Sequence, residues 1–283
     1  MSSNIVGIVG TGAMGSGIAQ VAAISGRNVV AVDVSASALE KAQATIRQSL
    51  SRMVKKESIS QEDADSAFSR ISFSTKYEAL SPADVIIEAA TETLDLKRKI
   101  LRDISRVAAE GTLIATNTSS LSVTALANEV QHPESFVGIH FFNPVPMMPL
   151  VEVVRGLATS DDASERASAF AQELGKTPVV VKNAPGFVVN RILVPMMNEA
   201  FFVLGEGIAS AEEIDVGMKL GANHPIGPLA LADMVGLDVL LLVVNILQTD
   251  TGDSKYRAAP LLREMVAAGQ LGRKTGQGVY KYD

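Results

Sequence analysis

Two residues of this sequence, His140 and Glu152, have the side-chain types and surroundings of an acid–base pair. His140 lies near the C-terminal end of a predicted strand, 136–142, and ligand crevices of open α/β sheets form at such ends. Glu152 interrupts the apolar run LVEVV, where a carboxylate is costly to bury unless it is paired. Pairing would orient the imidazole of His140 and stabilise its protonated form, as in general acid–base histidines. A solvated Glu152 is the alternative.

Further polar residues stand where a ligand could meet them. The segment NTSS, from Asn117 to Ser120, follows another strand end and either contacts a ligand or caps the next helix, although Ser122 could be that cap. Asn190 lies within the apolar segment GFVVNRIL. A buried amide needs hydrogen-bond partners, and a substrate oxygen is one candidate among several.

The remaining histidines, His132 and His224, each precede a proline. This position favours extended or turn backbone, so we interpret both as structural. The sequence has no cysteine and no cluster of His, Asp and Glu at metal-ligand spacing. It therefore predicts neither disulfides nor a metal site.

A glycine-rich stretch near the N-terminus, IVGIVGTGAMGSG, joins a short apolar strand to a helical pattern. Its glycines have the G-x-G-x-x-G spacing, which supplies a tight turn, a close approach for a pyrophosphate and close packing of helix on strand. The helix N-terminus offers unpaired N–H groups and the positive end of its dipole to the anion. The residues expected to bind the dinucleotide here are Gly10, Thr11, Gly12, Ala13, Met14 and Gly15.

Asp33 ends the next predicted strand, about 20 residues after the glycines, where a carboxylate can accept hydrogen bonds from the adenosine ribose. A carboxylate would repel a 2′-phosphate. The sequence therefore favours NAD over NADP as cofactor.

These side chains need a scaffold, and strands alternate with helices up to about residue 184. The pattern predicts a mostly parallel sheet with helices on both faces. From Pro185 onward the pattern is helical, so we predict an α/β domain over 1–184 and a smaller all-helical domain over 185–283. The expected elements of the second domain are helices at 185–204, kinked at Pro195, and at 211–220, 229–247 and 260–268, with a short strand at 279–280.

A helical hairpin interrupts the alternation after Asp33. Its first helix, expected over 36–56, ends in the basic residues Arg52, Lys55 and Lys56. This basic tip is either a site for an anionic group or a solvated helix end.

Bulk properties exclude several classes of protein. The 283 residues are 47% hydrophobic and carry a net charge of −6, which argues against general nucleic-acid binding. The N-terminus MSSN runs directly into the first strand and leaves no room for a signal peptide. The most apolar later stretch, 234–247, is too short to span a bilayer. We expect a cytoplasmic protein with no membrane partner.

The motifs together resemble the 3-hydroxyacyl-CoA dehydrogenase family, and most closely its bacterial 3-hydroxybutyryl-CoA members. The matching stretches are GTGAMGSGIAQ, AATE, NTSSLSV, GIHFFNPVPMMPLVEV, APGFVVNRI, GANHPIGPLALAD and GRKTGQGVYKY. They cover nearly the whole chain. The resemblance implies a Rossmann-type NAD-binding domain, a helical dimerisation domain, an active site between them, an acyl-CoA substrate and a homodimer.

The resemblance also implies roles for individual residues. His140 would be the catalytic base and Glu152 its partner, with Ser119 and Asn190 contacting the substrate. Residues implied near the cofactor, mostly its nicotinamide half, are Glu92, Lys97, Asn117, Ser119, Asn143 and Lys274. Ser49 and Lys56, in the helical hairpin, match residues that meet coenzyme A.

Two other interpretations remain. The β-hydroxyacid dehydrogenases share this domain plan but use a lysine on the first helix after the sheet domain, where this chain has Asn190 and Arg191. A non-catalytic, crystallin-like protein of the same fold would bind the cofactor without turnover. The complete set of His140, Glu152, Ser119 and Asn190 argues against lost activity.

Overall fold

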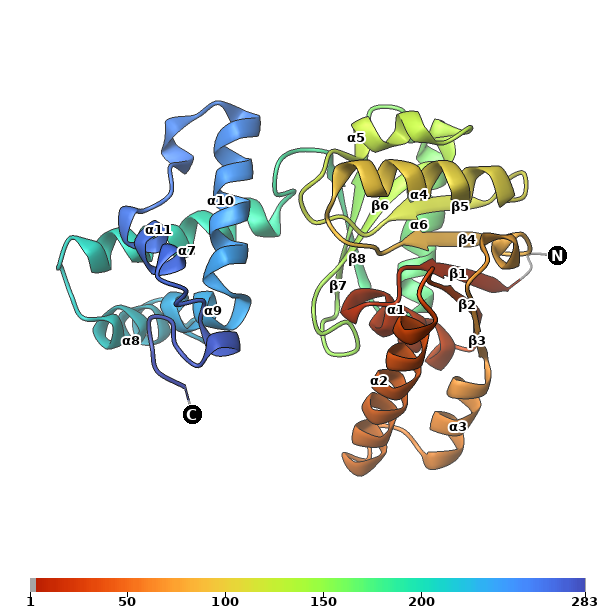
Figure 1. The fold of residues 1–283 in the computed structure, drawn as a ribbon, viewed down its shortest axis with the longest axis horizontal. Helices are drawn as coiled ribbons and strands as arrows, with labels where there is room; N and C mark the ends of the chain where they lie inside the picture. Colours follow the sequence, from red (N-terminus) through yellow and green to blue (C-terminus); the bar gives the residue numbers. More distant parts are fainter. Residues whose placement is uncertain (1–3, 283) are drawn as a thin grey trace. The chain divides into compact units, whose positions relative to one another are not determined.

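The computed structural model describes residues 4–282, and the chain divides between Ala184 and Pro185 into two units (Figure 1). The predicted absence of a signal peptide concerns mainly residues 1–3, which lie outside the described part.

The first unit is built on eight strands, and the central ones are apolar along their length because helices cover both of their faces. The strands are β1 (Ile5–Val9), β2 (Asn28–Val32), β3 (Ile71–Ser74), β4 (Val85–Glu88), β5 (Leu113–Thr116), β6 (Phe136–Phe141), β7 (Leu150–Arg155) and β8 (Thr177–Lys182). Their order is β3-β2-β1-β4-β5-β6-β7-β8, and only β6 and β7 are antiparallel. The predicted Rossmann-type, mostly parallel sheet is confirmed.

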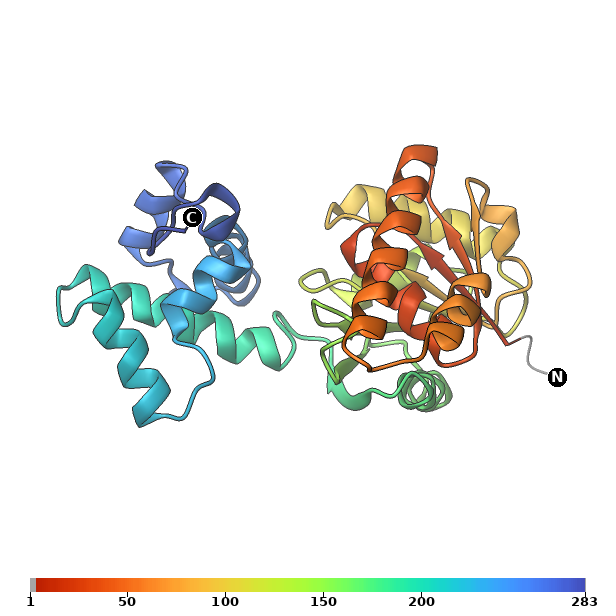
Figure 2. The same cartoon turned by 90° about the horizontal axis from the view of Figure 1, so that it is seen from below.

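The helices of this unit form layers on the sheet. They are α1 (Ala13–Ile24), α2 (Ala36–Lys55), α3 (Gln61–Ser69), α4 (Leu94–Val107), α5 (Val123–Leu126) and α6 (Asp161–Glu173). Helices α1 and α6 share one apolar core with the strands, and α2 and α3 pack against α1. Helices α4 and α5 lie on the opposite face (Figure 1). Figure 2 shows α2 and α3 in front of the strands.

The strand register brings the C-terminal ends of several strands to one edge of the sheet. Val9, Glu88 and Thr116, the last residues of β1, β4 and β5, pair across the ladder. The loops that follow these strands therefore leave the sheet at the same edge. The order of strands reverses between β1 and β4, and ligands of open α/β sheets bind at such a point.

The second unit contains five α-helices among its described residues, 185–282. They are α7 (Val189–Gly205), α8 (Ala211–Gly221), α9 (Pro228–Val235), α10 (Leu237–Thr251) and α11 (Pro260–Ala267). Short 3₁₀ turns lie at Ser254–Tyr256 and Arg273–Thr275. One apolar core joins the helices, with Phe201, Leu229 and Leu247 fully buried.

Three predictions about this unit were wrong. The helix expected from Pro185 begins at Val189, because Gly186 and Phe187 have positive φ angles of 74° and 49° and form a turn. Pro195 does lie inside this helix. The single helix expected over 229–247 is two helices, α9 and α10, which break at Gly236, where φ is +102°.

The short strand expected at 279–280 is also absent from the described structure. The amide N–H groups of Val279 and Tyr280 donate to the buried carboxylate of Asp233, each at 2.9 Å. Their donors are therefore used by a side chain, and only isolated bridges form at Gln277 and its neighbours.

Within residues 4–282, none of the helices taken singly has the length and apolar composition of a membrane span. Helices α9 and α10 meet that test only when joined, and they are bent by 99° at the break between them.

Candidate active site

The centre of the candidate site is a buried pair on the two antiparallel strands. His140 on β6 is the register partner of Glu152 on β7, and its Nδ1 lies 2.8 Å from the Glu152 Oε2. The two residues are 5% and 1% exposed. A carboxylate only accepts hydrogen bonds, so Nδ1 carries a proton and donates it to Glu152. Nε2 is then the nitrogen that can take up or release a proton.

The solvated alternative for Glu152 is therefore wrong, and the reason is the strand pairing. The short loop between β6 and β7 makes them antiparallel neighbours, which sets the two side chains opposite each other on one face. The ring of Phe142 packs at 4.5 Å from the imidazole, centroid to centroid.

A second buried carboxylate, Glu88, ends β4 and was not singled out from the sequence. It is fully buried and accepts hydrogen bonds from the Lys97 ammonium at 2.8 and 3.0 Å, from the Thr116 hydroxyl at 2.7 Å and from the Ala90 amide at 2.7 Å. The charged end of the apolar strand VIIE was the available signal, because such a group requires a partner.

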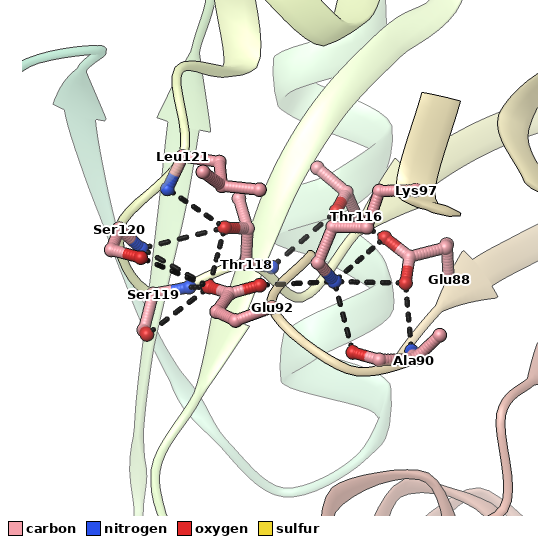
Figure 3. A network of polar contacts seen from close by, with 9 residues as sticks. All are labelled: Glu88, Ala90, Glu92, Lys97, Thr116, Thr118, Ser119, Ser120 and Leu121. Carbon is pink, nitrogen blue, oxygen red and sulfur yellow. Dashed lines mark hydrogen bonds and ion pairs between the residues drawn. The ribbon is translucent and has the colours of Figure 1, made fainter. Parts of the chain in front are cut away.

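Lys97, on α4, joins the buried Glu88 to the loop that follows β4 (Figure 3). Its side chain is 1% exposed, and its ammonium also contacts the Ala90 carbonyl at 3.1 Å and the Glu92 carboxylate at 3.1 Å. The expected contact of Lys97 with the cofactor stays a proposal. In the structure, the Lys97 ammonium contacts oxygen atoms of Glu88, Ala90 and Glu92.

Glu92 accepts hydrogen bonds from several donors of the loop that follows β5. Its Oε1 accepts hydrogen bonds from the Thr118 hydroxyl and the Ser119 amide, each at 2.6 Å, and from the Ser119 hydroxyl at 3.2 Å (Figure 3). Burial alone would raise the pKa of Glu92. The Lys97 charge and the donors from Thr118 and Ser119 outweigh burial, so the pKa of Glu92 lies below its ordinary value. Glu92 therefore stays ionised and holds Ser119 in place.

The alternative that the NTSS segment caps a helix is also wrong. Ser122 caps α5 by accepting from the Ala125 amide at 3.2 Å. Asn117 instead accepts from the Phe141 amide at 2.9 Å, which ties the end of β5 to the end of β6 beside His140. Ser119, two residues after Asn117, is half-buried.

The glycine loop has the geometry that a dinucleotide needs. Gly10 has a φ of +91°, and a Cβ on Gly15 would overlap the Gly10 carbonyl oxygen. A Cβ on Gly12 would meet nothing within 4 Å, so the backbone is open to a ligand there. The loop lines a cleft of about 850 Å³, together with Met14, Asp33 and Tyr77.

Asp33 follows β2 and lies on the same cleft. One of its carboxylate oxygens accepts from the Thr11 amide at 3.0 Å and the Thr11 hydroxyl at 3.1 Å, and the other accepts from the Ser35 amide at 3.0 Å. These bonds fix the carboxylate beside the glycine loop, where a ribose would lie.

The other predicted residues occupy three places. Asn143 is exposed on the loop after β6. In the hairpin Ser49 is half-buried on α2, and Lys56, the C-cap residue of that helix, is exposed. In the second unit Asn190 is half-buried in the first turn of α7, and Lys274 donates to Asp238 at 2.6 Å.

Two histidines have ordinary surroundings. His132 is exposed and lies 3.3 Å from Glu134, and His224 is half-buried. In the described part of the chain, no group of three or more His, Asp and Glu side chains is placed to hold a metal ion.

Comparison with known proteins places the chain in a family. The model of the 3-hydroxyacyl-CoA dehydrogenase NAD-binding domain matches residues 5–184, and the model of the C-terminal domain of that family matches residues 186–282. The chain belongs to the 3-hydroxyacyl-CoA dehydrogenase family. It is an oxidoreductase, and NAD is its cofactor.

Several members of the family are similar along nearly their whole length. A 3-hydroxybutyryl-CoA dehydrogenase from Bradyrhizobium diazoefficiens is 48% identical over 98% of this chain and 94% of its own. The mitochondrial hydroxyacyl-coenzyme A dehydrogenase of Rattus norvegicus is 43% identical over 98% and 90%. The crystal structure of an (S)-3-hydroxybutyryl-CoA dehydrogenase from Ralstonia eutropha superposes with a TM-score of 0.97 at 58% identity, over 99% of each chain.

The glycine loop of this family member gives a prediction with a built-in control. Gly12→Ala should change the free energy of unfolding by no more than about 0.5 kcal/mol, so the melting temperature should stay nearly the same. It should weaken NADH binding by about tenfold, ~1.4 kcal/mol, because the methyl group enters the space left for the pyrophosphate.

The control is Gly15→Ala, whose methyl group would overlap the Gly10 carbonyl. It should destabilise the fold by about 1–3 kcal/mol, the usual cost of overpacking. Calorimetry and NADH fluorescence titration measure both effects. If Gly12→Ala binds NADH as tightly as the wild type, the pyrophosphate does not approach this loop.

Proposed function

We propose that this enzyme interconverts 3-hydroxybutyryl-CoA and acetoacetyl-CoA with NAD(H), as a short-chain 3-hydroxyacyl-CoA dehydrogenase. The observation that carries the proposal is the buried His140–Glu152 pair at 2.8 Å, on the sheet edge that also bears the glycine loop. Two similar proteins, from Bradyrhizobium and Ralstonia, bear the name 3-hydroxybutyryl-CoA dehydrogenase. The names of these two proteins are the basis for proposing a 3-hydroxybutyryl group as the acyl chain of the substrate.

In this mechanism His140 is the general base. Its Nε2 takes the proton of the 3-hydroxyl group as the carbinol carbon is oxidised, and returns a proton to the oxygen when the ketone is reduced. Glu152 holds Nδ1 and stabilises the imidazolium that forms. Bound NAD⁺ supplies the hydride acceptor.

Ser119 and Asn190 are proposed to hold the substrate oxygen while its charge changes. Ser119 is supported by its position next to Glu92, which binds both its amide and its hydroxyl. Asn190, Lys274 and Asn143 are carried over from the family resemblance. Asn190 would contact the substrate, and the other two would contact the nicotinamide half of the cofactor.

The coenzyme A part of the substrate is proposed to meet the hairpin of α2 and α3. Lys56 is exposed and lies beside Arg52 and Lys55, which form the basic last turn of α2. The phosphates of coenzyme A are polyanionic, so this basic tip complements them. Ser49, about two turns earlier on the same side of α2, would contact the same group.

We also infer a homodimer through the second unit. Its exposed apolar side chains include Val216, Leu220, Met234, Val239 and Leu242, which are 41–81% exposed. Such a set on adjoining helices favours an interface. Light scattering that gives only the 29.8 kDa monomer at micromolar concentration contradicts this inference.

The first test is turnover. The purified protein should oxidise NADH with acetoacetyl-CoA, and NADPH should be a poorer substrate because Asp33 would repel the 2′-phosphate. Asp33→Ala should narrow the preference between the two cofactors. A protein that binds NADH but shows no turnover would be a non-catalytic relative, and a higher kcat/KM with NADPH contradicts the role of Asp33.

The second test concerns the pair. His140→Ala should lower kcat by about 10²- to 10⁴-fold, the range for a general acid–base group. Glu152→Gln should cost less, because a hydrogen bond survives while the charge is lost. The double variant should be little worse than His140→Ala, since the two groups act as one unit.

Steady-state kinetics of the three variants decide this point, and NADH titration serves as the control, because the glycine loop and Asp33 are untouched. Two independent, multiplying defects would show that Glu152 does not act through His140. Full kcat in Glu152→Gln across the accessible pH range would show the same.

The third test concerns the basic tip. Lys56→Ala should raise KM for acetoacetyl-CoA and spare kcat, because binding that is equal in ground and transition states affects KM alone. The effect should shrink as salt rises, since the tip is exposed to screening. Arg106→Ala, an exposed basic residue in the last turn of α4 that does not line the cleft, is the control. An unchanged KM at low salt would leave Lys56 as a solvated helix end.

A further inference from the structure

The loop between β6 and β7, residues 142–149, joins the two members of the buried pair. It leaves β6 directly after His140 and Phe141, and it enters β7 two residues before Glu152. It also carries Asn143. Most of the loop is exposed or half-buried, and Val145 is its one buried side chain. A loop with so little core contact needs other anchors to hold a fixed shape.

One anchor comes from helix α1. A Cβ on Gly17 would lie 2.8 Å from the Cβ of Val145, so the loop and the helix touch where the glycine leaves room. Another anchor is a ladder-like bond, in which the Thr177 amide at the start of β8 donates to the Pro149 carbonyl at 2.7 Å. Both hold only parts of the loop.

Lys176 binds the backbone of the loop at two points. Its ammonium donates to the carbonyl oxygens of Val145 at 2.7 Å and Met148 at 2.9 Å, and the residue is only 9% exposed. Among residues 4–282 it takes part in no ion pair with a carboxylate. The backbone of the loop is thus the partner of a buried cation. Burial lowers the pKa of Lys176.

We propose that Lys176 is a positioning residue of the active site, which fixes the 142–149 loop and, through it, the geometry of His140, Glu152 and Asn143. A buried ammonium is costly unless its donors are satisfied, and here two loop carbonyls accept from two of its three N–H groups. Lys176 lies in the short turn between α6 and β8, and its own amide donates to the Ala171 carbonyl of α6 at 2.9 Å, which ties the position to that helix. This inference rests on the proposed function for its kinetic part.

The test uses two substitutions of Lys176 with assays well below their melting temperatures. Lys176→Met keeps most of the length of the unbranched side chain and removes its donors. It should lower kcat about 10²-fold, the effect of a displacement of about 1 Å in a catalytic group, and should leave KM for NADH nearly unchanged. Lys176→Arg should recover about tenfold of that loss, because a guanidinium also donates N–H groups.

Arg27→Met is the matched control for stability. Arg27 is also a largely buried cation, 12% exposed in its side chain, and it pairs with Asp84 at 2.6 Å just before β4, at the opposite ends of the strands. Its loss should lower the melting temperature and spare kcat. An equal loss of kcat in Arg27→Met at an equal loss of stability would overturn the proposal.

Hydrogen exchange gives a readout that does not depend on the substrate. The amides of Met147 and Met148 donate to the Pro144 carbonyl, and in Lys176→Met they should exchange faster while α4 and α6 keep their protection. Unchanged exchange, or full kcat in Lys176→Met, would overturn the proposal. If the wild type fails to reduce acetoacetyl-CoA, the proposed function fails, and the exchange measurement still decides the role of Lys176.

Discussion

A carboxylate buried in the sheet must have a partner, and this sheet buries two at its functional edge. Glu88 and Glu152 are 0% and 1% exposed, and leaving either unpaired would be strongly destabilising. The two carboxylates have different partners. Glu88 has the ammonium of Lys97, which suits a permanent support, and Glu152 has the imidazole of His140, a side-chain type that can serve as a general acid or base. The same electrostatic requirement thus supports a loop in one case and, in the proposed mechanism, acid–base chemistry in the other.

The loops at this edge are held by side chains more than by strand ladders. Asn117 binds the backbone after β5 to the backbone of β6, and Glu92 gathers the amides and hydroxyls around Ser119. Lys176 does the same for the loop after β6. The glycine loop after β1 differs from these loops. It works through missing side chains, because Gly10 and Gly15 pack too closely for a Cβ and Gly12 leaves a ligand open space.

Much of the fold could be predicted from the sequence, because the first unit is built from local patterns. Buried parallel strands are continuous apolar runs, helices have capping residues such as Ser35 and Ser60, and the chain alternates between the two. The second unit was harder, since an apolar run does not reveal a break. The run at 229–247 looks like one helix, and only the packed chain shows Gly236 at a positive φ, with the two helices turned by 99°.

At the site, the sequence by itself determined the glycine motif and Asp33, because each depends on spacing within one or two adjoining elements. It offered the His140–Glu152 pair as one of two alternatives, and the antiparallel pairing of β6 and β7 decided between them. Only the tertiary structure decided which distant groups meet. It buried Lys97 between Glu88 and Glu92, turned the backbone of 279–280 toward Asp233, and set Lys176 under a loop nearly thirty residues earlier. The physical reason is that a buried polar group is satisfied by whichever donor or acceptor the packing brings within reach, and that choice leaves no periodic trace in the sequence.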